Sequence, residues 1–168
     1  MVVNRAVTVG IVCAFAIAAI SWGASKAAKS TPRRNGAPDA AIASSVVVPP
    51  GCSMVFLSGV GGLRPGEQAP KDLGDTEAQT TIALANLESS LKEVGLSLGD
   101  IVMMHSYLVA DPVRGKADFE GYSRAYKRLF GTPEQPNKPA RVTVVVSKLV
   151  VPDLLVEIEA IAAQCSSK

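Results

Sequence analysis

Two stretches near the C-terminal end, ARVTVVVSK at residues 140–148 and LLVEIEAIA at residues 154–162, alternate apolar with polar side chains. Successive side chains of a β-strand point to opposite faces of a sheet, so this alternation predicts two strands whose faces differ in chemistry. These strands are the starting point for the fold, because the elements before them must cover one of the two faces.

The apolar and polar faces of both strands can be assigned from this alternation. The apolar faces carry Val142, Val144 and Val146 in the first strand and Val156, Ile158 and Ala160 in the second. The opposite faces carry Arg141, Thr143, Ser147, Glu157 and Glu159 beside Leu155 and Ile161. We expect the valine faces to lie under helices. The mixture on the other face suits a subunit interface or a binding site better than open water.

Two helices and a strand are predicted upstream. Leucines recur at helical spacing after Thr76 and Gln79, which fit a capping box, and Gly95 suits the position just past the last turn. Ile101–Val109 is a β-type run, and Asp118 is placed to cap a second amphipathic helix. The spacing therefore predicts a helix, a strand and a second helix before the final two strands.

The domain is predicted to open with a hairpin. Ser45–Val48 and Met54–Ser58 are short β-type runs separated by Pro-Pro-Gly. A glycine-rich connection follows as far as Asp75, and a connection of this length usually has a use. The complete order is ββαβαββ, an α+β domain.

The N-terminal region differs in composition from this domain. Asn4 and Arg5 precede an uncharged run of 15 residues, 6–20, and small residues follow it, which is the order of a signal peptide. A membrane-spanning helix needs about 20 apolar residues, so cleavage is preferred over a retained anchor. We expect residues 1–24 to be a signal peptide, 25–43 a flexible tether and 44–164 the folded domain. The protein is then exported, to a periplasm, and meets a membrane only through an uncleaved leader.

Charge and cysteine content narrow the possible partners. The whole chain carries a formal charge of +2, but from residue 37 onward there are 12 basic and 15 acidic residues. No basic stripe remains to follow a phosphate backbone, so nucleic acid is not an expected partner. Outside the leader lie Cys52 and Cys165. An exported domain permits one disulfide, but pairing depends on their separation in space, and two independent thiols are the preferred interpretation.

Four segments occur in the order found in one known family. They are SGVGGL (58–63), DTEAQTTIALANLESSL (75–91), the proline-rich turn before Ala140-Arg141, and VEIEAIA (156–162). The chain resembles the YjgF/YER057c/UK114, or reactive-intermediate deaminase (Rid), proteins, some of which are labelled endoribonuclease L-PSP. The resemblance implies a chorismate-mutase-like fold with a mixed sheet and two helices on one face. It also implies a homotrimer around a central β-barrel, with sites in clefts between subunits.

The resemblance also implies roles for particular residues. Arg141 matches the arginine that binds the substrate carboxylate, and Glu157 matches the glutamate that positions the water attacking an imine. Backbone groups near Thr143 and the Ser58-Gly59 turn complete the cleft in related proteins. Such chemistry needs neither a metal nor an organic cofactor, because an imine carbon is already electrophilic.

Several alternatives remain for these residues. Arg141 can instead form a structural ion pair with a glutamate, and Glu159 shares the face of Glu157. His105, the one histidine, is interpreted as a strand residue packed or hydrogen-bonded in the interface. Ile42 and Val142 stand where many family members carry a tyrosine and a serine.

Three functions are compatible with this sequence. The first is an exported hydrolase that converts 2-imino or 2-enamino acids to 2-oxo acids and ammonia. The second is a non-catalytic trimer that binds small carboxylates or client proteins. Ribonuclease activity is third, since it requires a cationic path that the sequence does not provide.

Overall fold

The computed structural model describes residues 31–64, 66 and 73–165 of the 168-residue chain. Its elements are β1 (Arg33–Asn35), β2 (Ser45–Val47), β3 (Cys52–Gly61), α1 (Thr76–Glu93), the short 3-10 helix η1 (Leu98–Asp100), β4 (Ile101–Leu108), α2 (Phe119–Lys127), β5 (Ala140–Val145) and β6 (Val156–Cys165). The predicted leader, residues 1–24, lies outside the described residues. Neither helix in the described ranges is long and apolar enough to span a membrane.

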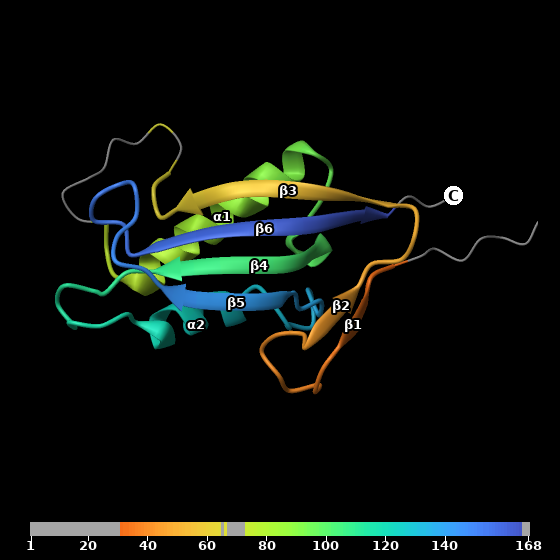
Figure 1. The fold of residues 1–168 in the computed structure, drawn as a ribbon, viewed down its shortest axis with the longest axis horizontal. Helices are drawn as coiled ribbons and strands as arrows, with labels where there is room; N and C mark the ends of the chain where they lie inside the picture. Colours follow the sequence, from red (N-terminus) through yellow and green to blue (C-terminus); the bar gives the residue numbers. More distant parts are fainter. Residues whose placement is uncertain (1–30, 65, 67–72, 166–168) are drawn as a thin grey trace, which may run out of the picture.

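A four-stranded mixed sheet forms the body of the domain. Its strand order is β3-β6-β4-β5, with β4 and β5 parallel and the other two pairs antiparallel. Both helices lie behind the same face of this sheet (Figure 1). The predicted α+β fold with two helices on one face is therefore confirmed.

The two helices begin where their capping residues place them. Asp75 caps α1 by accepting a hydrogen bond from the backbone N–H of Ala78 at 2.9 Å, one residue before the predicted capping box. Asp118 caps α2 as predicted, accepting from the N–H of Gly121 at 3.0 Å. Gly95 follows α1 with φ of 73°, a left-handed conformation that glycine adopts without strain.

The core lies between α1, α2 and the sheet. Leu84, Leu87 and Leu91 of α1 are fully buried against Val156 and Ile158 of β6. The apolar face of β6 therefore lies under the helices, as predicted.

The face assignment of β5 is wrong. Val142 and Val144 point away from the helices and are 45% and 40% exposed. Arg141 points toward α2, because it pairs with Met104, whose side chain is fully buried on the helix side of the sheet. Alternation shows that the two faces of a strand differ, but only its pairing shows which face meets the helices.

The predicted opening hairpin is also wrong. β2 pairs with β1, and β3 pairs with β6 instead. β1 lies inside the predicted tether, which is therefore incorrect for residues 31–43; residues 25–30 lie outside the described residues. The β1–β2 ribbon, set apart from the main sheet in Figure 1, is held by Arg34, which donates to the carbonyls of Gly99 at 2.8 Å and Ile101 at 3.2 Å. Because these contacts are hydrogen bonds to backbone carbonyls, the sequence of the ribbon carries no apolar periodicity that would predict it.

Cys52 and Cys165 form a disulfide rather than two independent thiols. They are direct partners in the β3–β6 register, with Cα atoms 4.2 Å apart. The bridge joins β3 to β6, which are the first and last strands of the main sheet in chain order and neighbours in space.

Candidate functional site

Arg141 lies between β5 and α2 in an aromatic environment. Its guanidinium carbon is 4.2 Å from the ring centroid of Tyr126 and 5.0 Å from that of Tyr122. The Nη1 atom is buried and forms no hydrogen bond among the described residues, and the same holds for the hydroxyl of Thr143. Arg141 and Thr143, which follow each other on one face of β5, therefore both carry buried polar atoms that have no partner within the described part of one copy.

The tyrosines around Arg141 remain neutral over the physiological range. Burial raises the pKa of both Tyr122 and Tyr126, and the nearby positive charge of Arg141 only partly opposes this effect. Arg141 and Thr143 lie near enough to the Tyr122 hydroxyl to favour its ionised form, without reaching hydrogen-bonding geometry. Arg141 forms no ion pair with an acidic side chain in the described ranges, so the alternative structural pairing is not present within one copy.

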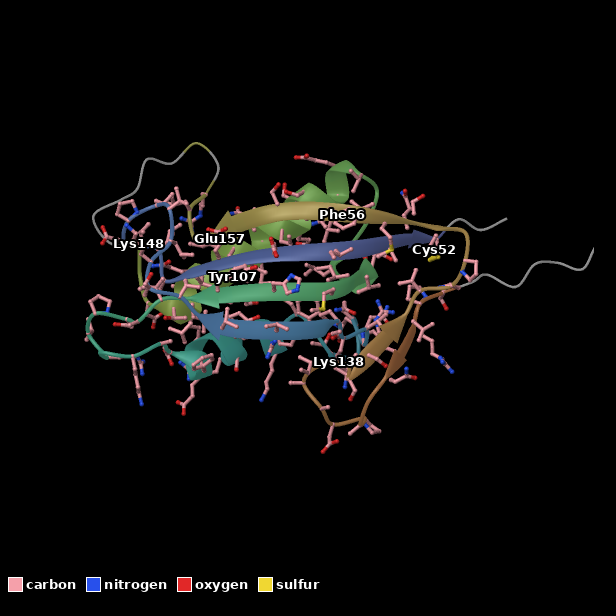
Figure 2. All side chains as sticks on the ribbon, in the orientation of Figure 1. Cys52, Phe56, Tyr107, Lys138, Lys148 and Glu157 are labelled. Carbon is pink, nitrogen blue, oxygen red and sulfur yellow. A yellow bond between two sulfur atoms is a disulfide. The ribbon has the colours of Figure 1, made fainter. Side chains whose placement is uncertain are left out.

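Glu157 lies on the other face of the sheet, beside Ser58 and Gly59, which the sequence interpretation placed in a turn but which lie at an irregularity within strand β3. Phe56, Tyr107 and Glu157 occupy the face turned away from the helices (Figure 2). A Cβ atom added at Gly59 would overlap Oε1 of Glu157 and lie 3.0 Å from its Cδ. Because Gly59 has no side chain, the Glu157 side chain can lie against the backbone there.

The structure distinguishes the two glutamates on this face. Oε1 of Glu159 accepts a hydrogen bond from the Tyr107 hydroxyl at 2.9 Å and lies 3.0 Å from Nδ1 of His105. The hydrogen bond from Tyr107 to Glu159 raises the pKa of Tyr107. His105 contacts a side chain of its own sheet face, and its predicted place in an interface stays a prediction. Glu157 has no hydrogen bond or ion pair among the described residues. Of the two carboxylates, Glu157 is the one free to hold a water.

The predicted site residues form two separate groups within one copy. Arg141 and Thr143 lie on the helix side of the edge strand β5, whereas Glu157, Ser58 and Gly59 lie on β6 and β3. The intervening strand β4 and the sheet itself separate the groups. The expectation that the arginine and glutamates share one face is therefore wrong, and a single copy does not bring them together.

Tyr122 and Tyr126 are the residues that the sequence interpretation missed. Their spacing of four residues indicated an ordinary buried helix face, and both are indeed 1% exposed. The sequence did contain a signal for this contact: the strand that carries the arginine directly follows a helix with two tyrosines in the chain.

A large cavity among the described residues lies elsewhere. Its volume is about 690 Å³, and it opens between the start of α1, the loop after β4 and the β5–β6 loop. None of the five predicted site residues lines it. No group of three or more His, Cys, Asp or Glu in the described ranges could hold a metal ion.

The mixed sheet and the two helices on one face define a small α+β domain, in which Nη1 of Arg141 is buried without a hydrogen-bond partner among the described residues. The family model described as Endoribonuclease L-PSP matches residues 36–164. The chain therefore belongs to that family, the Rid (YjgF/YER057c/UK114) proteins.

Individual relatives agree with this assignment. A RutC family protein of Pyrococcus abyssi is 39% identical over 53% of this chain, and the chain spans 62% of that relative's length. TdcF of Escherichia coli, named as a candidate reactive intermediate deaminase, is 33% identical over 67% of this chain and 80% of its own.

Solved structures show the same fold. YyfB of Yersinia pestis, a Rid family protein, superposes with a TM-score of 0.59 at 25% identity, covering 75% of this chain and 87% of its own. E. coli TdcF with bound serine gives a TM-score of 0.55 at 29% identity, covering 75% of this chain and 96% of its own.

Proposed function

We propose that this protein is a Rid-type deaminase that hydrolyses 2-imino or 2-enamino acids to 2-oxo acids and ammonia. The observation that carries the proposal is the pair of buried, unpartnered polar atoms, Nη1 of Arg141 and Oγ1 of Thr143. A buried donor without a partner is costly, and a ligand carboxylate would satisfy both groups. The relative TdcF binds serine, which is a small carboxylate.

The remaining half of the site comes from a second copy in this proposal. The sheet face opposite the helices exposes Phe56 (76%), Met54, Val142 and Val144. An apolar patch of this kind on a sheet face is typical of an interface between chains. A homotrimer closed through this face would place Arg141 of one copy near Glu157 of the next, which a single copy cannot do.

The chemistry follows from the two groups. Arg141 binds the carboxylate and fixes the C=N carbon, and an enamine first tautomerises to the imine. Glu157 takes a proton from the attacking water, the oxygen bonds to the imine carbon, and the nitrogen receives a proton. The resulting carbinolamine loses ammonia to leave the 2-oxo acid. The orientation of water and substrate supplies the rate enhancement.

The test is ammonia release from 2-imino acids generated in situ by an amino-acid oxidase. We expect the protein to accelerate release and the Arg141→Ala variant to lose that acceleration. If a folded wild-type protein gives no acceleration yet binds 2-oxo acids through Arg141, the non-catalytic carboxylate-binding trimer replaces the deaminase.

We also propose that the protein acts after export, in a periplasm. The Cys52–Cys165 disulfide supports this, because such bridges persist in oxidising compartments and are rare in the cytosol. The sequence of residues 1–24 has signal-peptide order. Fractionation of cells expressing the full chain tests the proposal: recovery of the protein in the cytosol with two free thiols would contradict it.

A further inference from the structure

Three aromatic side chains of α2 and the turn after it form a continuous row next to Arg141. Tyr126 stacks on Phe130 with centroids 4.6 Å apart and planes 9° apart, and on Tyr122 at 6.3 Å and 19°. The centroids of Tyr122 and Tyr126 are too close to each other for the two rings to sandwich the guanidinium. We call Tyr122, Tyr126 and Phe130 the aromatic row.

The row is fixed to the rest of the domain. The hydroxyl of Tyr122 shares a buried hydrogen bond with that of Ser106 on β4, at 2.7 Å. All three rings are at most 3% exposed and belong to the core. The row is therefore a closely packed surface against which the long side chain of Arg141 can be held in one orientation.

The chemistry of this contact differs from that of an ion pair. An acidic partner would occupy the in-plane N–H groups of Arg141, which are the groups that bind a carboxylate in bidentate fashion. Ring faces attract the cation through their quadrupole without accepting those in-plane hydrogen bonds. The row can thus stabilise the buried charge and leave its donors available for an anion.

We propose that Tyr126, supported by Tyr122 and Phe130, is a positioning residue that orients Arg141 for carboxylate binding. The inference rests on the proposed role of Arg141 as the carboxylate anchor. The ring of Tyr126, which has the shorter distance to the guanidinium, carries the effect, and its hydroxyl does not.

The experiment compares Tyr126→Leu, which removes the ring, with Tyr126→Phe, which keeps it. Leu87→Ala serves as a control, since Leu87 is fully buried on α1 and the variant lowers stability while keeping all three rings of the aromatic row. Two quantities are measured on the purified full chain. One is the dissociation constant for pyruvate beside the KM and kcat for the imine; the other is the NMR resonance of the Arg141 Nε–H group.

We expect Tyr126→Leu to raise the pyruvate dissociation constant and the KM roughly 2- to 30-fold, with a smaller change in kcat. The ring-current displacement of the Arg141 Nε–H resonance disappears in the same variant. Tyr126→Phe and Leu87→Ala retain wild-type affinity and the displaced resonance.

Unchanged affinity in Tyr126→Leu, or an equal loss in Tyr126→Phe or Leu87→Ala, overturns the inference. Two measurements together distinguish failure of the positioning role from failure of the proposed function: the activity and pyruvate binding of wild-type protein, and the Arg141 resonance. If wild-type protein neither binds pyruvate nor releases ammonia, the deaminase proposal and the positioning role that rests on it both fail. If wild-type protein binds pyruvate but Tyr126→Leu leaves the resonance unchanged, only the positioning role fails.

Discussion

Replacement of Gly59 by alanine is expected to impair catalysis while leaving the fold intact. The new methyl would overlap Oε1 of Glu157 and lie 3.0 Å from Cδ and 3.2 Å from Cγ, well inside normal contact. Gly59 does not have a positive φ, so alanine introduces no backbone strain there. The flexible end of Glu157 must therefore move by about 1 Å, and a displacement of that size can reduce turnover on the order of 100-fold.

The assay is steady-state ammonia release, with the unfolding midpoint in urea as a measure of stability. Gly99→Ala is the matched control, because a methyl there meets no atom closer than 3.5 Å. We expect kcat to fall in Gly59→Ala alone, with both variants within about 1 kcal/mol of wild-type stability. Wild-type kcat in Gly59→Ala would refute the role given to Glu157.

Three further predictions concern stability. Replacing Cys52 and Cys165 by serine opens a loop spanned by 113 positions in sequence and should lower the free energy of unfolding by about 4 to 5 kcal/mol; an equal denaturation midpoint with and without reductant would contradict this. The pKa of each of the three tyrosines is raised in the folded protein, so stability is retained below the unfolded value of about 10 and is lost as the pH rises through the folded values. Absorbance at 295 nm checks this, since tyrosinate forming below pH 10 in the folded protein would be incompatible. Arg34→Ala removes the charged donor to the Gly99 and Ile101 carbonyls and should cost about 2 kcal/mol in urea unfolding; an unchanged midpoint would show that the β1–β2 ribbon does not need this anchor.

The two helices and the four strands of the main sheet could be located from the sequence because their signals are local. Asp118 and Gly95 mark helix ends through their own backbone chemistry, and alternation in β6 assigned its buried face correctly. The β1–β2 ribbon could not be predicted, because Arg34 and backbone pairing hold it instead of an apolar stripe.

The candidate site was predictable as a set of residues but not as an arrangement. Resemblance identified Arg141 and Glu157, yet the face of β5 depends on its register with β4, which no local pattern encodes. Pairing of Cys52 with Cys165 likewise depends on the contact between the first and last strands of the sheet. The resemblance already preferred Glu157 over Glu159, and the contacts of Glu159 with His105 and Tyr107 add a structural reason for that preference.

The most direct test of the central claim is subunit complementation, because Arg141 and Glu157 lie on opposite faces of the sheet in one copy. Arg141→Ala and Glu157→Gln, each inactive alone, are unfolded together and refolded as an equal mixture. A trimer whose sites combine Arg141 of one copy with Glu157 of the next should recover about a quarter of the wild-type ammonia release. A mixture that forms mixed trimers and remains inactive would contradict the claim that the site is built between copies.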